Sequence, residues 1–453
     1  MEAASDNASA LKLSEVISAL SYALDITEGQ PEGHAARSCV IGMRIARELK
    51  LPDAQRSSLF YALLLKDLGC SSNAAKMCAL FGADDRQAKR DAKTTEWTSL
   101  VEQFKYIRQH VEPSASPLRK TIRIAKLSMT GPAAAKEMFQ IRCDRGGQIA
   151  RMFGFPDETA QAIRALDEHW DGNGHPLGTK GDAIPLLGRI LGISQTVEVF
   201  LAAYELEAAC QMAQQRRGTW FDPALVDILL SLRTDSVFWE TLSHADVLKQ
   251  CAELEPRDEL IYADETLLDT ISEGFAQVID AKSPWTFRHS TRVAEIAVGI
   301  GDVLGLSQSR LRILKRAGLL HDIGKLGISN TILDKPGKLT VEEVAEVHKH
   351  PAFTQHILSR ISTFSNLTEM AASHHERMDG RGYHRGLNGS QLSIEARILC
   401  VADVFEALSA ERPYRPKLSR ETVLEIMQKD AGPALCPESF AALKTFLEQK
   451  NFV

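Results

Sequence analysis

The sequence predicts an all-α protein made of two tandem copies of one helical domain. Apolar residues recur at three- and four-residue steps through most of the chain, as they do on the buried face of a helix. Alternating apolar and polar runs rich in β-branched residues, which would indicate strands, are scarce. The two halves of the sequence also match each other, which indicates an internal repeat.

The helical pattern is clearest in short segments spread over both halves of the chain. Five of them place apolar residues on one helix face: Ser14–Leu24, Ala35–Leu49, Leu59–Leu68, Val293–Val303 and Val423–Lys429. A length of 453 residues exceeds one ordinary core and favours two domains. The polar stretch Glu253–Asp264, which contains Pro256, is the predicted boundary. We therefore expect domains over residues 10–252 and 262–453.

The internal repeat is visible as two constant shifts between matching residues. A shift of 255 positions places His34, Asp67 and Gly69 on His289, Asp322 and Gly324. Farther along, a shift of 208 positions places Asp171, Gly172 and Gly174 on Asp379, Gly380 and Gly382. The first copy therefore contains 47 additional residues between Gly69 and Asp171.

Charge and cysteine usage exclude several classes of protein. The net charge of −6 disfavours nucleic-acid polymers and membrane surfaces, because both attract a basic face. The first residues lack the pattern of a signal peptide, and apolar runs stay below the roughly 20 residues that span a bilayer. Eight scattered cysteines are typical of reduced thiols. We expect a cytoplasmic protein without a membrane or nucleic-acid polymer as partner.

Histidine is concentrated in the second copy, where eight of the 13 lie between His289 and His384. The adjacent histidine and aspartate of LHDIGK point about 100° apart on a helix, so the carboxylate can bridge two cations while the imidazole binds one. Imidazoles and carboxylates in this order suit divalent iron, manganese or zinc. The predicted ligands are His289, His321, Asp322, His350, His374, His375 and Asp403.

These residues resemble the motifs of the HD-GYP family of HD-domain phosphohydrolases. The resemblance covers residues 262–435 and rests on His289, HDIGK, HKHP, HHERMDGRGY and ADVFEALSAERPYR. It implies an all-helical HD-type fold and hydrolysis of a cyclic dinucleotide, chiefly cyclic di-GMP. It further implies one metal held by His289, His321, Asp322 and Asp403, and a second held by Asp322, His350, His374 and His375.

The expected chemistry is hydrolysis by a hydroxide that two divalent metals activate. Two cations about 3.5–4 Å apart can hold a phosphodiester and stabilise its leaving oxygen. Asp322 would bridge the metals, and Lys325 can offset charge on a phosphate oxygen or on the alkoxide. Arg412 and Arg415 can hold the second phosphate. The segment Asp379–Tyr383, with Gly382, would be the substrate-binding signature loop.

Two positions depart from the family pattern. Trp285 stands where members with a third metal carry a glutamate, so we expect two ions, iron or manganese. His384 replaces the proline of the signature loop and is expected to fill space rather than to contact the substrate.

The first copy lacks most of the ligands. Lys66 replaces His321, Arg142 stands at His350, Leu166 and Asp167 replace His374 and His375, and Gln195 replaces Asp403. A lysine ammonium would repel a metal cation, so we expect no metal in this copy. A sensory, regulatory or dimerising role is expected instead, the last of which would give a homodimer. The basic stretches Lys89–Lys93 and Arg119–Lys126 are expected to be solvated helix faces.

Three functions remain open from the sequence. The first is a cyclic di-GMP phosphodiesterase, and the second is an HD-type phosphohydrolase of cyclic GMP-AMP or another nucleotide. The third is a catalytically silent nucleotide-binding or scaffold protein, against which the complete ligand set of the second copy argues. Nothing in the sequence separates guanine from adenine recognition.

Overall fold

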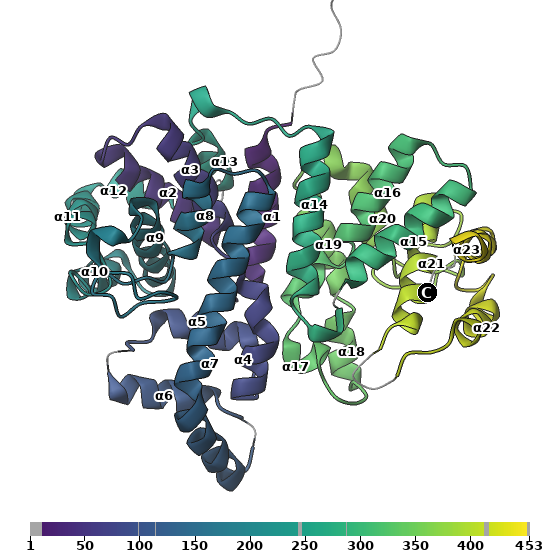
Figure 1. Ribbon diagram of the computed structural model, residues 1–453, viewed down its shortest axis with the longest axis horizontal. Coiled ribbons are helices and arrows are strands. Elements are labelled where there is room, and N and C mark those ends of the chain that lie inside the picture. The colour runs from purple at the N-terminus through teal and green to yellow at the C-terminus, as the bar shows by residue number, and fades with distance from the viewer. Residues whose placement is uncertain are drawn as a thin grey trace, which may run out of the picture. The chain divides into compact units, whose positions relative to one another are not determined.

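The computed structural model describes residues 11–97, 99–113, 115–242, 247–286, 288–411 and 416–450. Within these ranges the chain forms α-helices and short 3-10 helices, and isolated backbone bridges take the place of strands. The all-α prediction is confirmed. The chain divides into two compact units, Met1–Leu268 and Asp269–Val453 (Figure 1).

The core of the first unit consists of α2, α3, α8 and α9, in which α3 packs on the other three helices and α9 packs on α2 and α8 as well. The run Ser57–Leu65 at the end of α3 is buried throughout, which explains why this helix lies at the centre. The described helices are α1 (Leu13–Thr27), α2 (His34–Glu48), α3 (Asp53–Leu65), α4 (Ala74–Phe81), α5 (Asp85–Thr94), α6 (Leu100–His110), α7 (Pro117–Met152), α8 (Asp157–Arg164), α9 (Leu186–Ala203), α10 (Leu206–Gln215), α11 (Pro223–Ser231), α12 (Ser236–Thr241) and α13 (Val247–Glu253).

The helix α9 is the one described segment long and apolar enough to cross a membrane by length and composition. More than half of its residues, 56%, are buried inside the structure. It packs on α2, α8 and α10, as a core helix does.

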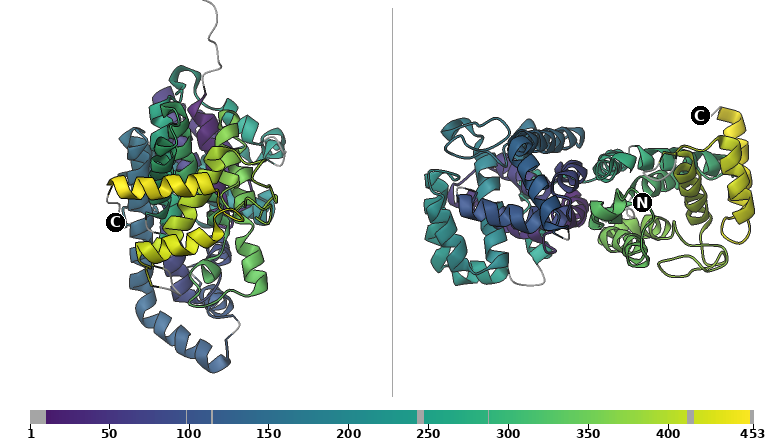
Figure 2. Two further views of the ribbon diagram at one scale, coloured as in Figure 1. Left: turned by 90° about the vertical axis from the view of Figure 1, so that its right-hand side faces the viewer. Right: turned by 90° about the horizontal axis from the view of Figure 1, so that it is seen from below.

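In the second unit, α15 is the central helix and packs on α16, α21 and α23, which are labelled in Figure 1. Figure 2 shows the same unit in green to yellow from two other sides. Gly299 permits close packing with α23, because a Cβ there would lie 2.2 Å from the Phe446 ring. The described helices are α14 (Glu265–Asp280), α15 (His289–Val303), α16 (Gln308–Leu320), α17 (Asn330–Leu333), α18 (Val341–Val347), α19 (His350–Leu358), α20 (Ser365–Ala372), α21 (Ile394–Ser409), α22 (Arg420–Asp430) and α23 (Pro437–Lys450).

The same local contacts occur in both units at the shifts that the sequence predicts. The carboxylate of Glu168 accepts a hydrogen bond from Leu177 N (2.8 Å), and that of Glu376 accepts one from Arg385 N (2.7 Å). A Cβ added to Gly69 would lie 1.9 Å from the Arg142 carbonyl oxygen, and one added to Gly324 would lie 2.0 Å from that of His350. These paired contacts confirm the repeat and place Arg142 at the position of His350.

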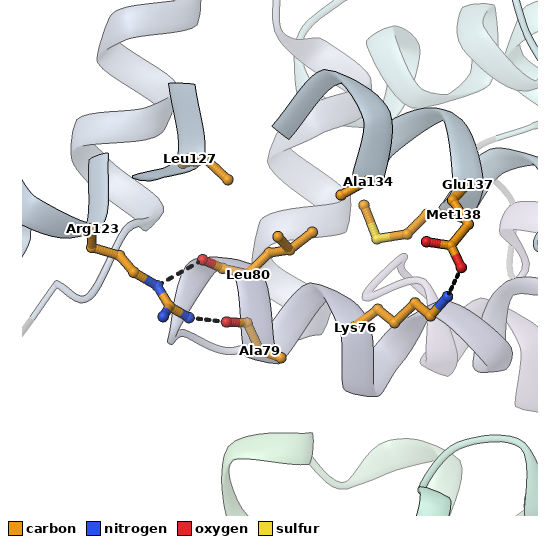
Figure 3. Close-up of a pocket in the computed structure, with 8 residues that line it drawn as sticks. All are labelled: Lys76, Ala79, Leu80, Arg123, Leu127, Ala134, Glu137 and Met138. Carbon is orange, nitrogen blue, oxygen red and sulfur yellow. Dashed lines mark hydrogen bonds and ion pairs between the residues drawn. The ribbon is translucent and has the colours of Figure 1, made fainter. Parts of the chain in front are cut away.

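The additional residues of the first copy therefore lie between Gly69 and Arg142. They include α4, α5, α6 and much of α7. Arg123 of α7 donates hydrogen bonds to the carbonyls of Ala79 and Leu80 (3.1 Å to Leu80) at the end of α4, where a cation stabilises the helix dipole. Figure 3 shows these contacts beside a groove of about 240 Å³ between the two helices.

The prediction that Lys89–Lys93 form a solvated helix face is wrong for its two lysines, whereas Arg90 between them is exposed. Lys89 Nζ lies 3.3 Å and Lys93 Nζ 3.1 Å from the buried carboxylate of Glu28, and the side chains of these lysines are only 8% and 13% exposed. The second basic stretch begins as predicted, since the Arg119 side chain is 75% exposed. A buried carboxylate on another helix draws the two lysines inward, and the local charge pattern cannot reveal such a partner.

Candidate metal centre

The seven predicted ligands lie together in the second unit, mostly at helix ends. His289 begins α15, His350 begins α19, and Asp403 lies within α21. His321 with Asp322 follows α16, and His374 with His375 follows α20. Three overlapping groups have ligand atoms within 4.8 Å of one another: His289, His321 and Asp322; His321, His374 and Asp403; and His350, His374 and His375.

A hydroxyl group holds the turn after α16 against α19. Thr354 Oγ1 accepts a hydrogen bond from Gly324 N (3.1 Å) and donates one to the His321 carbonyl (2.8 Å). Gly324 is required there because any side chain would collide with the His350 backbone. The helix that begins with His350 is thereby positioned beside the His321–Asp322 pair.

Three histidines share one arrangement that turns a ring nitrogen toward the centre. Each donates its Nδ1–H to a backbone carbonyl three residues earlier: His321 to Gly318 (2.8 Å), His350 to Val347 (2.7 Å) and His374 to Ala371 (2.5 Å). A neutral imidazole that donates from Nδ1 has its lone pair on Nε2. This is the usual way in which proteins orient a histidine that binds a metal.

The fourth inward-facing histidine, His289, is held by a carboxylate instead of a backbone carbonyl. Its Nδ1 donates a short hydrogen bond to Glu406 Oε2, and both side chains are nearly buried. The shift of 208 positions also matches Glu198 of the first copy to Glu406. Its contact with a predicted ligand was missed, although the first copy retains the same pair as His34 and Glu198.

The carboxylates of Asp322 and Asp403 lie close to the imidazoles, yet several of the polar atoms between them make no hydrogen bond. His289 Nε2 lies 3.3 Å from both Asp322 Oδ2 and Asp403 Oδ1, and His350 Nε2 lies 3.4 Å from Asp322 Oδ1. His289 Nε2, His321 Nε2 and Asp322 Oδ1 are buried and make no hydrogen bond. Buried polar atoms without partners are costly in a protein core. Convergent lone pairs of this kind fit a cation at their centre.

The carboxylates and the histidines shift each other's protonation. Although burial lowers it, Asp322 and Asp403 raise the pKa of His321 to about 9, so a bound cation would replace a proton there. Burial lowers the pKa of His374 to about 4, so its imidazole is neutral and can donate a lone pair. Its Nε2 lies 3.1 Å from that of His350, a separation at which two lone pairs repel each other. Although burial opposes ionisation, His321 and Lys325 keep the pKa of Asp322 well below its usual range. A cation would join these groups.

Lys325 lies at the edge of the centre. Its Nζ is 2.5 Å from Asp322 Oδ2, and its side chain is 22% exposed. The ammonium is therefore close to the predicted bridging carboxylate and accessible to a bound phosphate.

The signature loop is held against the ligands by stacked rings. Tyr383 stacks on His348 with ring centroids 3.7 Å apart and contacts His375 at 4.7 Å. Gly382 permits this approach, since a Cβ would lie 2.7 Å from the His375 carbonyl. The Asp379 carboxylate accepts hydrogen bonds from Arg377 and from Arg381 N (3.0 Å). Asp379 and Tyr383 thus shape the loop beside the centre.

Three predicted positions remain, His384 in the signature loop and the two arginines Arg412 and Arg415. His384 is exposed and its Nε2 lies 2.7 Å from Gln355 Oε1, pointing to a surface contact. Arg412 and Arg415 lie outside the described residues.

In the first unit, protein cations occupy the corresponding region. Lys66 forms an ion pair with Asp67, and Arg142 forms one with Asp167. Glu28, Asp67 and Cys70 are close enough to resemble a metal site. Lys89 and Lys93 contact Glu28, however, so ammonium groups already neutralise these carboxylates. Burial lowers the pKa of His34 to about 4, and its Nε2 makes no hydrogen bond.

Comparison with known families places both units in one group. A family model described as an HD domain matches residues 131–225 and 273–435, one part in each copy and more than half of the chain together. The chain belongs to the HD-domain family. Together with its relatives, its motifs make it an HD-GYP-type member and a metal-dependent phosphodiesterase.

Relatives of this HD-GYP-type chain include one protein that matches it over nearly its full length. It is 43% identical over 435 residues to 3′3′-cGAMP-specific phosphodiesterase 3 of Vibrio cholerae, covering 96% of this chain and 94% of the relative. It is 36% identical over 177 residues to the cyclic di-GMP phosphodiesterase response regulator RpfG of Xanthomonas campestris, covering 39% of this chain and 47% of that protein.

A solved structure resembles the whole HD-GYP-type chain. It is a crystal structure of a cyclic GMP-AMP-specific phosphodiesterase of V. cholerae, V-cGAP3, with 38% sequence identity and a TM-score of 0.67. The match covers 98% of this chain and 99% of the other. The similarity therefore extends over both units of this chain, the copy with the complete ligand set and the copy without it.

Proposed function

We propose that this protein hydrolyses 3′3′-cyclic GMP-AMP in its second unit. The observation that carries the proposed reaction is the convergence of seven imidazole and carboxylate side chains on one buried centre. The substrate is inferred from similarity to the V. cholerae cGAMP-specific phosphodiesterase, which extends over both units. The cyclic di-GMP phosphodiesterase RpfG matches a smaller part of the chain at lower identity. The comparisons therefore favour the alternative over the cyclic di-GMP expected from the sequence.

The proposed centre holds two divalent cations, with iron or manganese suited to its nitrogen and oxygen ligands. His289, His321, Asp322 and Asp403 would hold one cation, and Asp322, His350, His374 and His375 the other. Bound cations would supply the positive charge that polarises the phosphodiester and lowers the pKa of a water molecule.

The chain's own groups position the substrate and compensate charge. Lys325 lies at the accessible edge, where its ammonium can move from Asp322 to a phosphate oxygen that gains charge during cleavage. Tyr383 and His348 hold the signature loop beside His375 by stacking. Glu406 keeps the Nε2 of His289 directed at the centre.

The test is a comparison of kcat/KM for 3′3′-cyclic GMP-AMP, cyclic di-GMP and cyclic di-AMP with the metal-loaded protein, with products separated by chromatography. We expect the mixed dinucleotide to be hydrolysed with the highest kcat/KM. A kcat/KM for cyclic di-GMP that equals or exceeds it would overturn the substrate assignment. A loaded protein that cleaves none of the three would overturn cyclic-dinucleotide hydrolysis itself.

A further inference from the structure

The first unit contains a cavity of about 460 Å³ in the region that corresponds to the metal centre of the second unit. Four residues at former ligand positions line it: Arg142, Leu166, Asp167 and Gln195. Its volume lies within the roughly 300–1,000 Å³ typical of small-molecule sites. The incomplete copy has therefore lost the ligands of the metals but retains a cavity.

The inner end of this cavity is rich in cations. Lys89, Lys93 and Arg142 line it, and Lys66 is held beside them through Asp67. These four cations face three carboxylates, those of Glu28, Asp67 and Asp167. Although burial raises it, Lys93 and Lys89 lower the pKa of Glu28 to about 2, so this carboxylate stays ionised. Arg189, Glu168 and Asp222 also line the cavity, so cations and carboxylates balance over the whole lining.

Some of the polar groups at the cavity have unused hydrogen-bonding capacity. Gln195 is 8% exposed and Asn73 is 8% exposed; both line the cavity, and neither side-chain oxygen makes a hydrogen bond. Lys93 Nζ contacts Glu28 but also makes no hydrogen bond. Unpartnered amide and ammonium groups in a cavity fit a ligand that both donates and accepts hydrogen bonds.

Aromatic side chains form a large part of the remaining lining, and some of their rings contact other rings. The rings of Trp97, Tyr106, Phe139, Trp170, Trp220 and Phe221 line the cavity. Trp97 packs against Tyr106 with centroids 5.0 Å apart, and Trp220 stacks on His169 at 4.2 Å. Arg216 also lies over the Trp220 ring, 3.9 Å from its centroid, and His175 stacks on Phe139 at 4.7 Å. A planar base would stack on the ring faces that these contacts leave open. The combination of flat surfaces with a cationic end is suited to a base joined to a phosphate.

We propose that this cavity binds a purine nucleotide through its phosphate and base and does not hydrolyse it. Lysine and arginine take the part that the metals take in the second unit, because they can hold a phosphate but cannot activate water as a divalent metal does. The site goes beyond the proposed hydrolysis and lies in the unit without the predicted metal ligands.

The test measures nucleotide binding to the full-length, metal-stripped protein, so that hydrolysis does not consume the probe. GMP, AMP, the linear GMP-AMP dinucleotide, 3′3′-cyclic GMP-AMP and inorganic phosphate are titrated separately. We expect saturable binding of a nucleotide with quenching of tryptophan fluorescence, since three of the five tryptophans line the cavity. Binding by GMP or AMP assigns a mononucleotide, and binding only by the larger ligands assigns a dinucleotide.

Two variants locate the binding. Lys93→Gln should weaken it at least tenfold, and Arg90→Gln is the matched control, because Arg90 is on the same helix but has a side chain 55% exposed outside the cavity. Ala135→Trp should prevent nucleotide binding by filling the cavity without removing a charge. This variant tests the location of the site if Lys93→Gln does not fold. Absence of nucleotide binding, unchanged binding in a folded variant, or equal binding of inorganic phosphate alone would overturn the proposal.

Discussion

Removal of the Glu406 carboxylate should weaken metal binding without removing a metal ligand. Glu406 accepts the Nδ1–H of His289 in a buried, charge-assisted hydrogen bond. His289 Nε2 lies 3.3 Å from carboxylate oxygens of Asp322 and Asp403, so a rotation of its ring would move a ligand atom out of the centre. Groups that orient a metal-binding histidine typically contribute about 10- to 100-fold in affinity or activity.

The size of the effect depends on what replaces the carboxylate. Glu406→Ala removes both the acceptor and the charge, and we expect a loss of about 10- to 100-fold, or about 1.4–2.8 kcal/mol. Glu406→Gln keeps an oxygen acceptor and loses the charge. The difference between a charged and a neutral hydrogen bond is about 1 kcal/mol, so a loss of about fivefold is expected.

The assay is hydrolysis of 3′3′-cyclic GMP-AMP as a function of added manganese. Activity of both Glu406 variants should recover toward that of the unchanged protein at high metal concentration, because the ligands themselves remain. Glu198→Ala is the matched control, since it removes the same contact with His34 in the unit expected to hold no metal. Full metal affinity in folded Glu406→Ala, or an equal loss in Glu198→Ala, would refute the reasoning.

Further predictions concern the bridging carboxylate, the first copy and the altered loop. Asp322→Ala should abolish hydrolysis and lower the metal content, measured by elemental analysis, below the two ions per chain expected for the unchanged protein; near-normal turnover with both metals bound would contradict the proposed centre. Lys66→His should add neither metal nor activity to the first copy, and a third metal per chain in this variant would contradict that expectation. His384→Pro should change turnover less than tenfold, because His384 contacts Gln355 at the surface; a larger loss with the metals retained would give His384 a role in the reaction.

The sequence could predict much of the candidate centre because each ligand lies in a short motif of fixed spacing. His321 and Asp322 are adjacent, and so are His374 and His375. Two adjacent residues at a helix end lie close together regardless of how the rest of the chain folds. The repeat was equally accessible, since its two shifts are constant over long windows. Paired contacts in the two units, such as those of Gly69 and Gly324, follow directly from these shifts.

Contacts between distant segments could not be predicted in the same way. Lys89 and Lys93 are buried because Glu28, about 60 residues earlier, has its carboxylate inside the first unit. The inserted segment has no counterpart in the second copy, so the repeat gave no information about it. The role of Glu406 could have been inferred from the sequence, because the first copy retains both Glu198 and His34 although it lacks most of the predicted metal ligands. Their joint retention could have indicated a direct contact.

At matching positions of the same helical fold, the two units surround their carboxylates with different side chains. In the second unit, histidines surround the carboxylates of Asp322 and Asp403, and the buried polar atoms that converge there without hydrogen bonds fit a cation from outside the protein. In the first unit, ammonium and guanidinium groups face the carboxylates, so the protein supplies the cations itself. A metal would have to displace Lys66 and Lys93 against their attraction to Asp67 and Glu28. Replacing Lys66 alone leaves Lys93 and Arg142 in place, which is why Lys66→His should not create a metal site.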